Sequence, residues 1–317
     1  MLLYVTIFTA LAPPFLLILL GAALKRLGVL NSAHVPVMNG LVLNITLPAL
    51  VVAGLLHAPP LSPRLALPVL ALIAGEAAAA AALFGAARLL RLPNPLLGAL
   101  LLVGVFGNTG FIGYPLTLAL FPKQFPAAIL MDQFAMSLPM YLLAAIVGGR
   151  LGSGSGHRAA LRRFFRSPIF WGAIIGLALH AVRLPPLLSQ MPILAKLGMV
   201  TMQCLGYLGQ GTTPLVLLAL GVALRPGAAL KRPGALALAC AAKLLLSPLI
   251  VWVLCRALSV TGEVRAETLL QAAMPSAVMA SVLAGQNDLE GDFAVGVVFA
   301  ATVLSAITAP LLLSLLP

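Results

Sequence analysis

Apolar windows of about 20 residues recur along the whole chain, and each could cross a hydrocarbon core of about 30 Å as a helix. Only 8% of the residues are charged, compared with about a quarter in soluble proteins. The alternating pattern of barrel strands is missing. The sequence therefore predicts an all-α polytopic membrane protein. Its ten predicted spans are 4–24, 36–57, 66–87, 96–120, 126–148, 168–183, 203–224, 234–258, 266–286 and 292–316.

Basic residues between the spans indicate the orientation, because cytoplasmic loops carry an excess of Lys and Arg. With the N-terminus outside, the inner loops hold twelve such residues and the outer loops six. We therefore expect a multi-pass protein of the inner (plasma) membrane, with residues 4–24 retained as the first span, both termini outside and the basic loop 151–167 in the cytoplasm. The net charge of +12 is divided among short loops, so we expect no nucleic-acid partner.

The basic loop divides the chain into halves, 1–150 and 168–317, each with five predicted spans. Because five is an odd number, the second half would enter the membrane in the opposite sense, which gives an inverted repeat typical of secondary transporters. Proline and glycine are common in membrane helices, so a chance alignment of the halves is the alternative. The residues that align are Pro48 with Pro214, Thr46 with Thr212, Glu76 with Lys243 and Asn108 with Pro275.

Two predicted spans contain residues that disfavour a continuous helix. The fourth contains GNTGFIGYP, residues 107–115, and the ninth contains QAAMPSAVMASVLAGQ, residues 271–286. Proline lacks a backbone donor and glycine relaxes the backbone, so both spans are expected to unwind near mid-membrane. Unwound backbone there must be buried in protein or line a wet cavity. Two facing breaks would direct helix N-termini at one point, which is a favourable site for an anion.

The segment NTGFIGYP, residues 108–115, resembles the crossover motif of the auxin efflux carrier family, which includes plant PIN-type carriers and bacterial relatives. MPSAVMASVLA, residues 274–284, resembles the second crossover. The resemblance covers essentially the whole chain and implies ten helices in two inverted five-helix repeats, with helices 4 and 9 broken and crossing, as in bile acid sodium symporters. It implies a scaffold of helices 1, 2, 6 and 7 that forms a homodimer, and a transport domain of helices 3–5 and 8–10 that carries organic anions.

The resemblance also assigns residues. Asn108 matches the crossover asparagine that helps to hold a substrate carboxylate, and Pro115 and Pro275 match the crossover prolines. The second crossover departs from many relatives, which have asparagine or proline where this chain reads VMA, residues 278–280. Polar residues beside the prolines of spans two and seven would either line the scaffold side of the cavity or satisfy carbonyls freed at the kinks. The predicted substrate-binding residues are Asn108, Thr109, Gly110, Gly113, Pro115, Pro275, Ser276, Asn44, Gln210 and Thr212.

Three ionisable side chains are predicted to lie deep in spans, where each is costly unless it is paired or hydrated. Asp132 is expected either to act in coupling or gating, or to cap amides exposed at the crossover. Gln133 is expected to point to another side of the helix. Lys243 would pair with Glu76 across the repeat axis or extend its ammonium toward the inner interface. The predicted coupling or gating residues are Asp132, Glu76 and Lys243.

Together these features favour a secondary transporter of organic anions (carboxylates) that works by alternating access, with the substrate at the helix 4/9 crossover. We expect helix dipoles and Asn108 to neutralise the anion, because the crossovers contain no basic residue. The alternatives are a sodium-coupled bile-acid-type symporter and a channel or receptor of the same fold, and coupling to a proton or sodium stays open. An intramembrane enzyme is disfavoured because no acid–base pair is clustered at depth, and the cysteine and histidine spacings predict no metal or cofactor.

Overall fold

The structure is a computed structural model that describes residues 2–58, 62–152, 162, 165–182, 192–223 and 231–315. Across these residues the chain is helical and contains no named strand. The all-α membrane class is therefore confirmed, whereas the ten-helix inverted repeat and the orientation stay predictions. Most of the predicted basic loop lies outside the described residues. Six described segments are long and apolar enough to cross a membrane: His34–Leu56, Pro63–Leu89, Pro122–Leu151, Ala195–Ala223, Pro233–Ala257 and Gly291–Leu315.

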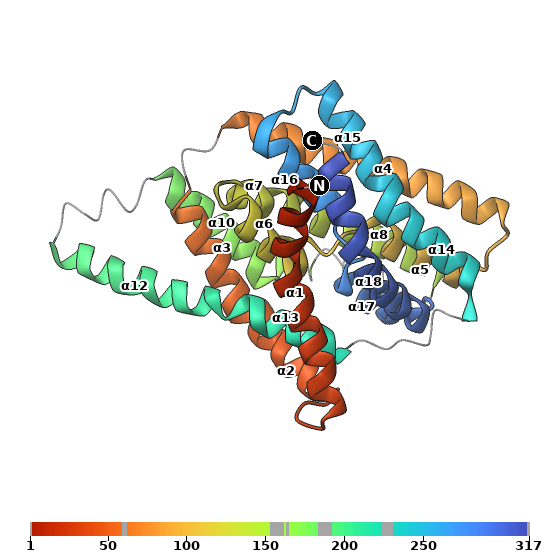
Figure 1. The fold of residues 1–317 in the computed structure, drawn as a ribbon, viewed down its shortest axis with the longest axis horizontal. Helices are drawn as coiled ribbons and strands as arrows, with labels where there is room; N and C mark the ends of the chain where they lie inside the picture. The colour runs from red at the N-terminus through yellow and green to blue at the C-terminus, as the bar shows by residue number, and fades with distance from the viewer. Residues whose placement is uncertain are drawn as a thin grey trace. The chain divides into compact units, whose positions relative to one another are not determined.

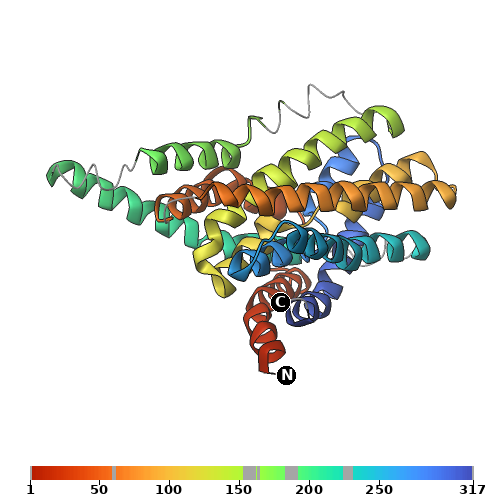
Figure 2. The same ribbon diagram turned by 90° about the horizontal axis from the view of Figure 1, so that it is seen from above.

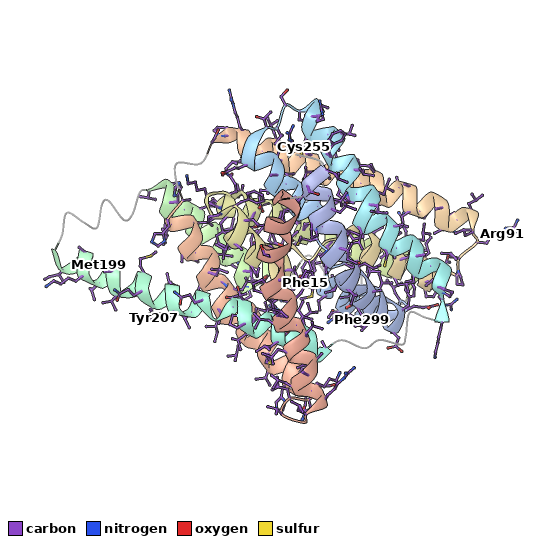
Figure 3. The ribbon with its side chains drawn as sticks, viewed as in Figure 1. Phe15, Arg91, Met199, Tyr207, Cys255 and Phe299 are labelled. Atoms are coloured by element: carbon purple, nitrogen blue, oxygen red, sulfur yellow. The ribbon has the colours of Figure 1, made fainter. Side chains whose placement is uncertain are left out.

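Apart from the long helices α1 and α4, the elements of the first half are short helical pieces joined into longer segments (Figure 1). They are α1 (Leu2–Arg26), α2 (His34–Leu41), η1 (Val42–Thr46), α3 (Leu47–Leu56), η2 (Pro63–Leu65), α4 (Ala66–Leu89), α5 (Asn94–Val105), η3 (Thr109–Gly113), α6 (Tyr114–Leu120), η4 (Pro122–Gln124), α7 (Phe125–Leu130), η5 (Met131–Ser137) and α8 (Leu138–Leu151). Arg91, labelled in Figure 3, lies in the connection from α4 to α5 and has a positive φ of 54°. That backbone conformation allows the sharp turn between the two helices.

The second half is built in the same way. Its elements are α10 (Pro168–Ala181), α12 (Pro192–Gln210), α13 (Thr212–Ala223), α14 (Pro233–Ala241), η7 (Ala242–Leu246), α15 (Ser247–Ala257), α16 (Gly262–Ala272), α17 (Val278–Gln286) and α18 (Gly291–Leu315). Like α5 and α6 in the first half, α16 and α17 are too short to cross a bilayer alone, because a span needs about 20 residues.

Four segments, η1, η3, η5 and η7, are π-helical turns, and each ends two residues before a proline. The prolines are Pro48, Pro115, Pro139 and Pro248. A proline donates no backbone hydrogen bond and its ring collides with the carbonyl four residues earlier, so the preceding turn widens. Pro115 therefore widens a helical turn, and the break in this span lies earlier, at residues 106–108.

The chain forms two compact units, which we describe separately. Unit 1 comprises Met1–Pro13, Pro63–Phe164 and Leu224–Pro317, and unit 2 comprises Pro14–Ser62 and Phe165–Ala223. Each unit combines segments from both halves of the sequence. Both interrupted spans and their surrounding helices belong to unit 1.

The centre of unit 1 is α5, which contacts α4, α8, α14, α17 and α18. Every residue from Leu96 to Val105 is buried, as expected for a helix that is apolar on all sides. Next to it, α15 runs alongside α4 in both ribbon views (Figures 1 and 2). A Cβ on Gly75 would lie 2.5 Å from Val251 Cγ2, so the absence of a side chain at Gly75 permits this close approach.

In unit 2, α3 packs against α10 and α12, and α13 packs against α2. Glycines again allow close helix contacts: a Cβ on Gly221 would lie 2.0 Å from the Ile18 carbonyl oxygen. By contrast, Met199 and Tyr207 lie along α12 (Figure 3), and their side chains are 60% and 74% exposed. The described part of unit 2 therefore combines a tightly packed interior with an apolar outer surface, as in a protein surrounded by lipid.

Candidate functional site

The two interrupted spans are joined at their breaks. After α5 the chain is extended at Phe106, and after α16 it is extended at Ala277. Gly107 and Ser276 form an isolated antiparallel bridge. The Asn108 amide donates to the Pro275 carbonyl at 2.7 Å, and the Ala277 amide donates to the Phe106 carbonyl at 2.9 Å. The backbone groups left unpaired at one break thus hydrogen-bond to those of the other. Such pairing is required where irregular backbone is buried away from water.

Asn108 begins the helix that follows the first break. Its side-chain oxygen accepts from the Phe111 amide at 3.3 Å, and its carbonyl accepts from Ile112 and Gly113 at 3.1 Å each. The residue is 5% exposed, and its side-chain Nδ2 has no partner in the described part of the chain. Asn108 therefore fixes the helix start with its oxygen and leaves an amide donor free at the break.

Ser276, in the second break, uses its hydroxyl differently. The side chain is fully buried, and Oγ donates to the Val103 carbonyl at 2.5 Å. Val103 lies in the last turn of α5, where carbonyls lack partners within the helix. The Ser276 hydroxyl thus caps the C-terminal end of α5 by pairing one of its free carbonyls. The preceding Pro275 accepts the hydrogen bond from the Asn108 amide.

Asp132 lies in η5 and is almost fully buried. Its Oδ1 accepts from the Thr109 hydroxyl, and its Oδ2 accepts from Tyr114 Oη at 3.0 Å and from Gln133 Nε2 at 2.6 Å. The expectation that Gln133 faces another side was wrong, because its amide reaches back to the adjacent carboxylate within a π-helical turn. Within the described residues all three donors to Asp132 are side chains, so Asp132 links η5 to η3 and α6 and caps no backbone amide there. Gly110 also lies next to it, since a Cβ there would be 3.5 Å from Oδ1.

Lys243 reaches the joined breaks from η7. It is fully buried, and its Nζ donates at 2.6 Å to the carbonyl of Ala272, the last residue of α16. Nζ also lies 3.3 Å from where a Cβ on Gly107 would be. The crossover segments themselves contain no basic residue, but Lys243 reaches them from η7, so neutralisation by Asn108 and helix dipoles alone is not what the site offers. The alternative that the Lys243 ammonium extends to the inner interface was wrong. A cation at the end of α16 is favoured by the negative end of the helix dipole.

Glu76, the predicted partner of Lys243, lies on α4 and is 3% exposed. Neither of its carboxylate oxygens has a hydrogen-bond partner among the described residues. In the same residues the one ion pair within 4.0 Å joins Arg232 to Glu290. Glu76 and Lys243 thus attract each other as charges but form no direct pair in this conformation.

A second buried polar cluster was missed by the sequence analysis. It contains Thr117 on α6 and Glu267 and Gln271 on α16, all fully buried. The Thr117 hydroxyl is 2.7 Å from Glu267 Oε1 and 3.0 Å from the Gly113 carbonyl, so its one proton serves either oxygen. Gln271 Nε2 donates to Thr117 Oγ1 at 2.9 Å and to Glu267 Oε1 at 2.5 Å. The available signal was a carboxylate and an amide four residues apart, which share one helix face just before a break.

Gly113 makes room for this cluster. A Cβ at this position would lie 2.5 Å from Gln271 Oε1, closer than any side chain tolerates. Glu267 was overlooked because it stands at the first turn of the predicted span 266–286, where an acidic residue normally faces water. The packing of α16 against α4, α7 and α18 buries it instead.

The remaining predicted site residues lie in unit 2. Asn44 is exposed, and its Nδ2 donates to the Gly40 carbonyl at 2.8 Å, so it satisfies a carbonyl of its own helical segment. Gln210 is exposed at the end of α12. Thr212 and Thr46 are buried, and the hydroxyl of each is unpartnered within the described chain. The alternative that polar residues satisfy carbonyls at the kinks thus fits Asn44 but not these two threonines.

Comparison with known proteins assigns the chain to a class of membrane proteins. The membrane transport protein family matches residues 6–151 and 157–313. An uncharacterized transporter of Methanothermobacter thermautotrophicus is 29% identical over 297 residues, which cover 93% of each chain. An uncharacterized transporter of Methanocaldococcus jannaschii is 26% identical over 293 residues, or 92% of each chain. The matches therefore extend over both breaks and both units, and they indicate a membrane transporter without naming a substrate.

Proposed function

Because the chain belongs to the membrane transport protein family, which is the auxin efflux carrier family, we propose that it is a secondary transporter of organic anions. The observation that carries the substrate class is the free, buried amide of Asn108 at the joined breaks. A carboxylate accepts hydrogen bonds and cannot donate them, so it is the complementary ligand for an unpartnered donor. A buried donor without a partner costs about 1–3 kcal/mol, which a bound carboxylate would recover.

Two further features support an anion at this point. The helical segments Thr109–Leu120 and Val278–Gln286 both start at the breaks, and helix starts carry partial positive charge. The Lys243 ammonium lies beside Gly107, next to Asn108. We therefore propose that a carboxylate is neutralised by Asn108, the helix starts and Lys243 together, with Thr109, Gly110, Gly113, Pro115, Pro275 and Ser276 shaping the backbone around it.

Alternating access requires one part of the protein to carry the site and another to stay in place. We propose that unit 1 is the moving transport domain, because it holds both breaks, and that unit 2 is the scaffold. Asn44, Gln210 and Thr212 would then be the scaffold residues that line the substrate path. The scaffold is also the proposed surface of a homodimer.

Within unit 1, we propose that Asp132, Glu76 and Lys243 serve coupling or gating. Asp132 accepts hydrogen bonds from two residues of the segment that follows the first break, Thr109 and Tyr114. A change in its charge would therefore change the hydrogen bonds that hold the helix begun by Asn108. The test is substrate flux measured against gradients of pH and of sodium. Asp132→Asn should abolish or alter one of these dependences, and an unchanged dependence would leave Asp132 with a structural role.

The experiment for the substrate site is uptake of a panel of carboxylates into proteoliposomes. Asn108→Ala should reduce flux at least tenfold, since a hydrogen bond to a charged group contributes about 1.5–3 kcal/mol. Asn94→Ala is the matched control, because Asn94 is an exposed residue at the start of α5 in the same unit. If both variants transport as well as the parent protein, the breaks are not the substrate site.

A further inference from the structure

Glu267 forms no ion pair with any basic side chain that the structure describes. The side chain is fully buried, and its Oε2 has no partner among the described residues. Its two recorded donors, Thr117 and Gln271, are neutral and both bind Oε1. Burying a carboxylate without compensation costs several kcal/mol, so some positive species must offset the charge when Glu267 is ionised.

A second free oxygen lies in the same cluster. Gln271 Oε1 is buried and unpartnered within the described part of the chain. Its amide cannot simply be turned round, because the oxygen would then meet Glu267 Oε1, and two acceptors would face each other. The orientation of the amide is thus fixed by Glu267 and Thr117, and the oxygen is held close to Gly113.

The two free oxygens lie at a place that suits a cation. Gln271 is in the last turn of α16, one residue before the helix ends at the break, and such half-helix ends carry partial negative charge. The Lys243 ammonium on the Ala272 carbonyl offsets part of that charge but donates to neither free oxygen. In transporters with broken helices, these ends and nearby carbonyls coordinate sodium ions or protons. Thr117 and the Gly113 carbonyl add oxygens from the other interrupted span.

The other two buried carboxylates of unit 1 are different. Both oxygens of Asp132 already accept hydrogen bonds, so neither is without a partner. Glu76 has free oxygens but is attracted by the buried ammonium of Lys243. Of these three carboxylates in the described chain, Glu267 is the one that combines a free oxygen of its own with a free oxygen on a hydrogen-bonded neighbour, Gln271.

We propose that Glu267, Gln271 and Thr117 form a binding site for a monovalent metal cation such as sodium. Glu267 Oε2 and Gln271 Oε1 are the principal ligands, and all ligands are oxygens, which hard cations prefer. The single carboxylate charge matches a single positive charge. A proton on Glu267 would neutralise the carboxylate but would leave Gln271 Oε1 unused, which is why the oxygen pair favours a metal ion.

The experiment is thermal unfolding of the purified full-length protein in sodium, lithium, potassium and choline chloride, at constant ionic strength and pH. The parent protein should be stabilised by sodium relative to choline, with Tm rising with the logarithm of sodium concentration, by about 5 °C at a hundredfold excess over Kd. Glu267→Gln should abolish this rise. Glu263→Gln, one turn away on α16 and exposed, should keep it.

A second variant keeps the test decisive if Glu267→Gln does not fold. Gln271→Leu keeps the carboxylate and removes one ligand, so it should raise the sodium concentration needed for the same Tm rise at least tenfold. Equal Tm of the parent protein in all four salts, or a sodium effect that survives in Glu267→Gln, would overturn the proposal. A response to pH without any response to metal ions would also overturn it, in favour of a proton. Because no substrate or flux is involved, failure here is independent of the transport test on Asn108.

Discussion

Asp132 and Glu267 are buried carboxylates that both contact the second half of the same interrupted span, yet their surroundings are opposite. Asp132 accepts from three side-chain donors that use both of its oxygens. Glu267 accepts from two donors at one oxygen, and the other oxygen has none in the described residues. Both oxygens of Asp132 thus have donors, whereas one oxygen of Glu267 has none among the described residues.

The difference separates a carboxylate that holds its donors in place from one that can take a further ligand. A carboxylate whose oxygens are filled by fixed donors holds those donors in place, and its removal leaves several buried groups unpaired. A carboxylate with a free buried oxygen is costly on its own and becomes favourable when a cation arrives. Asp132 is therefore expected to hold the shape of the break, and its proposed role in coupling or gating would act through that shape. Glu267 is expected to bind a cation from the medium.

The largest effect is expected for Asp132→Ala. Thr109, Tyr114 and Gln133 would each lose their acceptor in a buried site, at about 1–3 kcal/mol for each unpaired group. We expect the unfolding free energy to fall by about 3 kcal/mol or more, as measured by titration with a denaturing detergent. Asp132→Asn, which keeps one acceptor oxygen, should lose less. A loss below about 1 kcal/mol for the alanine variant would remove the structural role assigned to Asp132.

A smaller effect is expected from two glycine substitutions that probe the two clusters in the same helical turn. A Cβ at Gly113 would lie 2.5 Å from Gln271 Oε1, whereas a Cβ at Gly110 would lie 3.5 Å from Asp132 Oδ1, which is an ordinary contact. Because the Gln271 amide is held at its nitrogen, it cannot move without losing bonds. Gly113→Ala should cost about 1–3 kcal/mol by overpacking, and Gly110→Ala should cost less. The same denaturation assay tests both, and equal losses would contradict the packing of the Glu267 cluster.

Much of the interrupted architecture could be predicted from local chemistry. The helix-disfavouring residues of 107–115 and 271–286 correctly indicated where the two spans are irregular. The role of Pro115 could not be predicted, because a proline can either end a helix or widen its preceding turn. The outcome depends on whether the segments before and after the proline are both packed as helix. At Pro115 they are, since η3 runs directly into α6 and both contain buried residues.

The contents of the site were harder to predict because they depend on contacts between distant segments. Asn108 was identified from its own motif. Lys243 was identified as an intramembrane charge, but only the packing of η7 on α5 shows that its ammonium reaches the break. Glu267 was missed entirely, since hydropathy places it at a membrane boundary while tertiary packing buries it completely.

A third prediction compares two threonines that donate to the two carboxylates. Thr109 donates to Asp132, and Thr117 donates to Glu267 or to the Gly113 carbonyl. Because Thr117 shares its proton between two acceptors, its loss should matter less to the carboxylate. Thr109→Val should cost about 1.5–3 kcal/mol, as for a hydrogen bond to a charged group, and Thr117→Val about 1 kcal/mol. Double-mutant cycles measure the coupling energies of the Thr109–Asp132 and Thr117–Glu267 pairs, with Asp132→Asn and Glu267→Gln as the second variants. A stronger coupling for Thr117–Glu267 would mean that Glu267, not Asp132, is the carboxylate that holds its donors in place.

The smallest effect on stability is expected for Glu267→Gln in choline chloride, without a binding cation. The glutamine keeps an acceptor for Thr117 and Gln271 and removes a charge that pairs with no described basic side chain. The lost hydrogen-bond strength and the relieved cost of burial act in opposite directions. We expect a change within about 1 kcal/mol, with stabilisation favoured, whereas Asp132→Asn in the same medium should destabilise. If both variants lose stability equally, the free oxygen of Glu267 is not costly, and the two carboxylates differ in geometry but not in function.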